Sequence, residues 1–199
     1  MNRILLTLAS VSTAFLGYAL WLGFSIENAR SLDPQQQAAV SFHVLVAVGT
    51  LILAGLVHAL CLTYFMGTGR WIEETTRAYH LSNSWHRENQ SLKYRTLPPM
   101  VFALAMLLAT GAFGGAADPA AGTGFQGLWG VSAATLHMLV ACTTVTLNLL
   151  VNLTEYSAIL RNGQLIEEIL QDVMRIRAEH GLSNEPAHAA EHLGQPSGS

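Results

Sequence analysis

Four long apolar segments without a charged side chain limit what this sequence can fold into. They run from Ile4 to Phe24, Ala38 to Met66, Met100 to Ala117 and Leu128 to Thr154, with lengths of 21, 29, 18 and 27 residues. A helix needs about 20 predominantly apolar residues to cross the hydrocarbon core of a bilayer. We therefore expect an all-α integral membrane protein with four transmembrane helices.

The basic residues are unevenly distributed around these segments. Of the ten Lys and Arg residues, only Arg30 follows the first or the third segment, and the other nine lie on the opposite side. Because cytoplasmic loops carry an excess of Lys and Arg, both termini are predicted to be cytoplasmic, in what we expect to be a bacterial inner membrane. The net charge of −3 gives no reason to expect a nucleic acid partner. The expected partners are lipid and other membrane protein subunits, in a homo- or hetero-oligomer.

An internal repeat relates the second and fourth segments. Residues 41–74 and 135–168 match at twelve of 34 positions without a gap, including a histidine, a glycine and paired glutamates at an offset of 94. Shared apolar composition does not readily place these residues in one register. We expect two tandem hairpins of the same topology that form a pseudo-twofold four-helix bundle.

The repeat divides the chain into five parts. A first transmembrane hairpin is predicted over 1–66, a cytoplasmic helical connection over 67–97 and a second hairpin over 98–157. A cytoplasmic amphipathic helix follows over 158–181, because apolar residues recur with helical spacing from Leu165 to Ile176. The tail over 182–199 is rich in Ser, Pro, Gly and Ala, a composition typical of disorder.

Small and polar residues share one helical face in the second and fourth segments. Their spacing of three or four residues places each set on one side of a helix. Because polar side chains are costly against lipid, both faces are expected to line the bundle interior. The second segment contributes His43, Ala47, Thr50, Ala54, His58 and Cys61, and the fourth contributes His137, Ala141, Thr144, Asn148, Asn152 and Glu155.

The interpretation that the sequence favours is structural. Buried His, Asn and Thr side chains hold transmembrane helices together by hydrogen bonds. The chain is then a small inner-membrane subunit that anchors or supports a larger membrane complex. No nucleophile, phosphate-binding or zinc motif occurs in the sequence, so we expect no catalytic activity of the chain on its own.

Two alternatives assign chemistry to the same face. In the first, the chain is a b-type cytochrome subunit that serves transmembrane or quinone-linked electron transfer. His43 and His137 are then the axial ligands of one haem b between spans two and four. The expected cavity lining consists of Ala47, Ala141, Thr50 and Thr144.

In the second alternative, the polar face is a path for protons or a polar solute. The residues of this polar stripe are His58, Asn148, Asn152 and Glu155. They continue from the two histidines toward the predicted cytoplasmic side.

Overall fold

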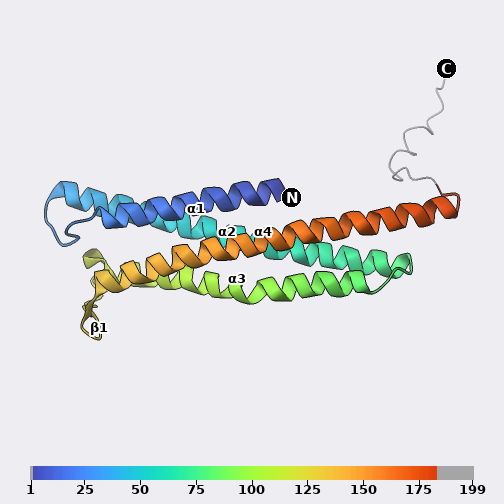
Figure 1. Cartoon of the computed structure of the whole chain (residues 1–199). Coiled ribbons are helices and arrows are strands. Elements are labelled where there is room, and N and C mark those ends of the chain that lie inside the picture. Colours follow the sequence, from blue (N-terminus) through green and yellow to red (C-terminus); the bar gives the residue numbers. More distant parts are fainter. Residues whose placement is uncertain (1, 183–199) are drawn as a thin grey trace, which may run out of the picture.

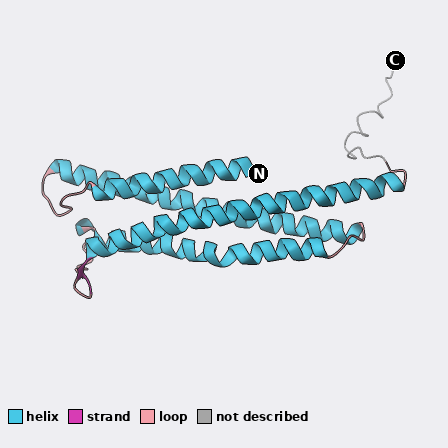
Figure 2. Cartoon of the chain, in the orientation of Figure 1, coloured by secondary structure: helices cyan, strands magenta, loops and turns pink. Residues whose placement is uncertain are grey.

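The computed structural model describes residues 2–182, which are almost entirely helical (Figures 1 and 2). The main helices are α1 (Asn2–Phe24), α2 (Pro34–Ala78), α3 (Ser84–Ala117) and α4 (Ala133–Glu179). A 3-10 turn, η1 (Pro119–Ala121), and two short strands, β1 (Gly127–Leu128) and β2 (Val131–Ser132), connect α3 to α4. All four α-helices are long and apolar enough to cross a membrane, in agreement with an all-α membrane bundle. The predicted disordered tail lies outside the described residues, apart from residue 182.

The helices run lengthwise beside one another as a four-helix bundle (Figure 1). Both α1 and α3 pack against α2 and α4, whereas α2 and α4 lie diagonally opposite and meet in the interior. One end of the bundle holds the connections 25–33 and 118–132, and we call it the β-hairpin end. The turn between α2 and α3 lies toward the other end, and α1 extends only part of the way to it (Figure 1).

Local sequence signals fix how α2 and α4 begin at the β-hairpin end. The side chain of Asp33 accepts a hydrogen bond from the backbone N–H of Gln35, and Pro34 occupies the first turn of α2. The side chain of Ser132 caps α4 in the same way by accepting from Thr135. Both helices that carry the candidate histidines therefore have well-defined starting points.

The β1–β2 turn leads directly into α4. Trp129 and Gly130 have φ values of 52° and 78°, the left-handed conformation that a two-residue hairpin turn requires. At Gly127, with φ of 128°, a Cβ atom would collide with the carbonyl oxygen of Val131. Glycine is therefore needed where the hairpin closes.

Apolar clusters fill the bundle along its length. One lies at the middle, where all four helices contribute, and another lies beyond the apolar segments, where α2 packs against α4. The middle cluster includes Leu5, Val57, Phe65, Met100 and Ile159. The second cluster consists of Ile72, Leu165, Ile169 and Val173.

Candidate functional site

The rings of His43 and His137 face each other near the β-hairpin end. His43 projects from α2 and His137 from α4, and their ring centroids lie 6.3 Å apart with an angle of 70° between the ring planes. Both side chains are half-buried. Because α2 and α4 are diagonal helices, both rings lie in the interior of the bundle. The structure thus brings together the two residues that the sequence pairs.

Each of these rings lies against a glycine of a neighbouring helix. A Cβ atom on Gly23 of α1 would lie 3.2 Å from Cε1 of His43. A Cβ atom on Gly114 of α3 would lie 3.0 Å from Cε1 of His137. Such distances are shorter than ordinary van der Waals contacts between carbon atoms. An alanine at either position would therefore require the ring to move by a few tenths of an ångström.

Each ring also lies beside the backbone of the residue one turn before its glycine. This residue is Ala19 for His43 and Thr110 for His137. Nδ1 of both rings is nevertheless buried without a partner of standard hydrogen-bond geometry in the part of the chain that the structure describes. The backbone of α1 and of α3 therefore offers the candidate acceptor for each ring.

The expected lining residues surround this pair on α2 and α4. Ala47 and Ala141 are half-buried, and Thr50 and Thr144 are buried. The hydroxyl groups of Thr144 and Thr110 share a hydrogen bond of 2.7 Å. The hydroxyl group of Thr50 has no partner among the described residues. Small side chains thus follow each histidine toward the middle of the bundle.

A second polar site lies deeper, where His58 of α2 contacts two residues of α4. Nδ1 of His58 lies 2.7 Å from Oε1 of Glu155, and Nε2 lies 3.0 Å from Oδ1 of Asn148. The side chains of His58 and Glu155 are each only 1% exposed. Asn152 does not join them but donates to the hydroxyl group of Thr13 on α1 at 3.2 Å.

The two cysteines do not form a disulfide. Cys61 is buried one turn from His58, and Cys142 is partly buried; both are free. Within residues 2–182, no group of three or more His, Cys, Asp or Glu side chains could hold a metal ion. The polar sites therefore consist of residue pairs and hydrogen-bonded networks.

A third polar network joins α2, α3 and α4 beyond the apolar segments. Nδ2 of Asn89 donates to Oδ1 of Asn162 at 2.7 Å, and Nδ2 of Asn162 donates to Oγ1 of Thr68 at 3.0 Å. Asn89 also lies against Gly69, where a Cβ atom would come 2.8 Å from its Oδ1. The network fastens the three helices together where they leave the apolar region.

A partly exposed ion-pair cluster lies beside this network. Arg161 of α4 donates to Glu88 of α3 at 2.7 Å and to Glu168 at 2.9 Å. The hydrogen bonds from Glu88 and Glu168 raise the pKa of Arg161 above its ordinary value. The guanidinium group therefore stays charged under all ordinary conditions.

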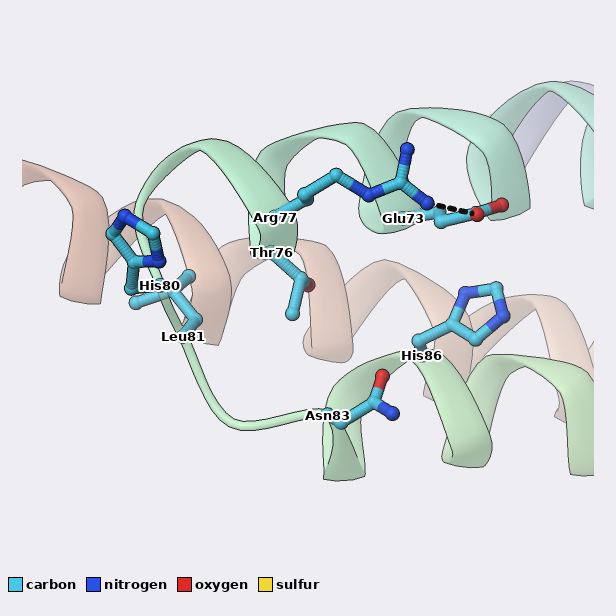
Figure 3. Close-up of a pocket in the computed structure, with 7 residues that line it drawn as sticks. All are labelled: Glu73, Thr76, Arg77, His80, Leu81, Asn83 and His86. Carbon is cyan, nitrogen blue, oxygen red and sulfur yellow. Dashed lines mark hydrogen bonds and ion pairs between the residues drawn. The ribbon is translucent and has the colours of Figure 1, made fainter.

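A shallow polar depression lies at the turn between α2 and α3 (Figure 3). Arg77 on its rim donates to Glu73 at 2.8 Å. The hydroxyl group of Thr76 and Nδ1 of His86 have no partner among the described residues. The lining comprises Glu73, Thr76, Arg77, His80, Leu81, Asn83 and His86. Its open shape and mixed charge do not indicate a particular ligand.

Sequence reasoning missed Gly23, Gly114, Thr110 and Thr13 as parts of these sites. The two glycines could have been found from their positions in the sequence. Gly23 lies near the end of α1, directly before the helix of His43, and Gly114 lies near the end of α3, directly before the helix of His137. Comparison with known proteins found no matching family model, no matching curated protein and no matching solved structure.

Proposed function

We propose that the chain is a b-type cytochrome subunit of a membrane, with His43 and His137 as the axial ligands of one haem. The observation that supports this most directly is the separation of 6.3 Å between the two ring centroids. A nitrogen–metal bond of about 2.0 Å and about 1.1 Å from nitrogen to ring centre on each side place the centres of two opposed imidazole ligands about 6 Å apart. The observed separation is close to this value, so His43 and His137 are the residues that would hold a haem iron if one were bound.

The number of available ligands favours haem over a bare metal ion. A structural or catalytic zinc ion takes three or four protein ligands. No third His, Cys, Asp or Glu joins His43 and His137 within the described residues. A haem needs only two protein ligands, since its porphyrin supplies the other four nitrogens.

The surroundings of the two rings support the same proposal. Gly23 and Gly114 allow the rings to lie close to α1 and α3. The small side chains of Ala47 and Ala141 leave the next turn of α2 and α4 free of bulky groups. Nδ1 of each ring is then free to donate to a backbone carbonyl group, which fixes the ring and makes Nε2 the ligating atom. A bound haem would supply one-electron redox chemistry.

Two contacts support the proposed duplication. His43 faces His137, and Nδ2 of Asn162 donates to Oγ1 of Thr68 at 3.0 Å. In both cases the two residues are equivalent at the offset of 94 in the sequence. A pseudo-twofold axis along the bundle would bring equivalent positions of α2 and α4 together in this way.

The distribution of basic residues supports a proposed orientation. Arg30 is the only Lys or Arg in the two connections at the β-hairpin end. This end would face away from the cytoplasm, and both termini would be cytoplasmic, with the inner membrane of a bacterium as the location. The haem would then lie toward the outer side, where it could exchange electrons with a quinone or an outer donor.

An anchoring role is the second candidate, and one surface favours it. Leu170 and Met174 are exposed on α4 beyond the apolar segments. Apolar side chains in such a position suit contact with another subunit. In this case the chain would support a larger membrane complex, and the paired histidines would serve helix packing.

The experiment that tests the proposal is optical. The protein is purified in mild detergent from its native membrane, and its spectrum is recorded oxidised and after dithionite reduction. We expect a sharp reduced α band in the wild type and in His80→Ala, a control at an exposed histidine. We expect the band to be lost in His43→Ala and in His137→Ala.

A colourless protein that stays colourless when haem is added would refute the haem proposal. So would a haem spectrum that survives replacement of both histidines. Folding of each variant is checked by helical circular dichroism, so that loss of haem is distinguished from loss of the bundle. A folded and colourless wild type would leave the anchoring role.

A further inference from the structure

The buried pair of His58 and Glu155 has no part in the proposed haem ligation. It lies at the level of the middle apolar cluster, among Val57, Val151 and Ile159. A buried ion pair contributes little net stability compared with apolar residues of similar size. His58 lies within the second apolar segment and Glu155 directly follows the fourth, and ionisable side chains inside membrane spans generally mark functional sites. The pair therefore calls for a chemical role.

The hydrogen bonds around His58 fix how many protons the pair holds. Nδ2 of Asn148 donates to the backbone carbonyl of Thr144 at 2.9 Å, so Oδ1 of Asn148 is the atom that faces His58. Nε2 of His58 must then carry a hydrogen and donate to it. One further proton lies between Nδ1 of His58 and Oε1 of Glu155, 2.7 Å apart. Whichever atom holds that proton, the pair as a whole is neutral.

One acceptor of this site remains open. Oε2 of Glu155 is buried and has no hydrogen-bond partner in the described part of the chain. Leaving a buried acceptor unsatisfied is costly. A second proton bound at Oε2 would give the pair a net charge of +1. The site can thus change its charge by one unit.

A polar column runs from this pair toward the histidines at the β-hairpin end. His58 contacts Asn148, Asn148 donates to the Thr144 backbone, and the Thr144 hydroxyl group contacts that of Thr110. The ring of His137 lies beside the Thr110 backbone. Fifteen residues separate His43 from His58 on α2, or about 22 Å at 1.5 Å per residue.

We propose that the pair of His58 and Glu155 is a proton-binding site whose occupancy is linked to the oxidation state of a haem held by His43 and His137. This inference rests on the proposed haem function. Reduction of a bound haem would add one electron and lower the net charge of the bundle by one. The proton taken up at Oε2 comes from the aqueous phase and restores that charge.

The distance between the haem site and the pair of His58 and Glu155 determines how strongly haem reduction and proton binding affect each other. Two unit charges about 22 Å apart, at an effective dielectric constant of about 20, change each other's binding equilibrium three- to fourfold. For a one-electron couple this corresponds to about 30 mV, at 59 mV per tenfold change. Because reduction favours proton uptake, the midpoint potential is higher at low pH and falls as the pH rises.

Few other titratable groups act on the site. Cys61 of α2 interacts electrostatically with Glu155, and Tyr64 of α2 packs against the same cluster and interacts with Cys61. The residues that α1 and α3 contribute at this level, Leu5, Ala9, Met100 and Ala103, carry no titratable group. A pH dependence of the haem midpoint potential that is lost when Glu155 is replaced can therefore be assigned to this pair.

The test is the haem midpoint potential from pH 5 to pH 9 in the full-length protein. We expect a fall of about 30 mV in the wild type. Glu155→Gln keeps an oxygen that accepts from His58 but cannot titrate. We therefore expect the decrease of about 30 mV in midpoint potential to be absent in this variant. Glu167→Gln, the same substitution at an exposed site of α4, is the matched control and keeps the wild-type fall. Propionate groups of the haem are unchanged in all three proteins.

A second readout uses the wild type alone. Infrared difference spectra between the reduced and oxidised protein should contain a carboxylic acid band that shifts in heavy water. A wild-type potential independent of pH, together with no such band, would overturn the proton-binding site while leaving the haem function standing. An equal pH dependence in Glu155→Gln would also overturn it. Absence of any haem spectrum would refute both proposals, and this outcome is visible before any titration.

Discussion

Replacing Gly114 by alanine tests how tightly the ring of His137 is held. The added Cβ atom would lie 3.0 Å from Cε1, 3.4 Å from Nδ1 and 3.6 Å from Nε2 of His137. The ring must therefore move by about half an ångström to restore ordinary contact with carbon. Overpacking of this kind costs about 1–3 kcal/mol. If the ring is also an iron ligand, this cost appears as a roughly 5- to 150-fold loss of haem affinity.

The neighbouring Gly115 provides the control. A Cβ atom there has nothing within 4 Å, so Gly115→Ala adds a methyl group at almost the same depth without touching the ring. Alanine in a helix is favoured over glycine by up to about 1 kcal/mol. We therefore expect Gly115→Ala to keep full haem content and to be as stable as the wild type or slightly more stable.

The assay is a titration of the apoprotein with limiting haem, followed by absorbance and normalised to protein concentration. We expect the wild type and Gly115→Ala to bind haem with equal affinity, and Gly114→Ala to bind it much more weakly. Gly23→Ala, with a contact of 3.2 Å to His43, should fall between. If Gly114→Ala binds haem as tightly as Gly115→Ala, the ring is not confined by α3, and the reasoning about the site is wrong.

Three further predictions concern the polar contacts. Glu155→Leu should lower the free energy of unfolding by about 3–5 kcal/mol, because it leaves His58 buried without its partner. The double variant Glu155→Leu with His58→Leu should recover most of this loss. Unfolding in detergent measures the stability of both variants. Asn162→Ala removes hydrogen bonds to Asn89 and Thr68 and should cost about 1–3 kcal/mol in the same assay. Arg161→Ala should change stability by less than about 1 kcal/mol, because its ion pairs are more than one-third exposed; a larger loss would show that the cluster is buried in the native membrane.

The spanning helices could be predicted from the sequence because their signal is local. Length without charge decides whether a segment can cross a bilayer, whatever its neighbours are. The meeting of His43 and His137 could also be predicted, because the two residues align with each other at the offset of 94 in the sequence. Both predictions need only the positions of residues along the sequence and no knowledge of how the helices pack.

The partners of His58 could not be predicted in the same way. Its equivalent in the repeat is Asn152, yet His58 contacts Asn148 and Glu155, one turn to either side. The ring reaches both because it projects between two turns of α4, and that depends on how the helices cross. Likewise, sequence alone does not separate Gly114, which contacts a ring, from Gly115, which does not.

The buried carboxylate of Glu155 also has a consequence for biogenesis. An acidic side chain opposes insertion of a lone spanning helix, and Glu155 directly follows the fourth apolar segment, which ends at Thr154. Its partner His58 lies in α2, which is synthesised before α4. The first hairpin is therefore made before Glu155, and it can receive the carboxylate when α4 packs against it. A second hairpin made alone would lack that partner and should be recognised by membrane proteases as unassembled.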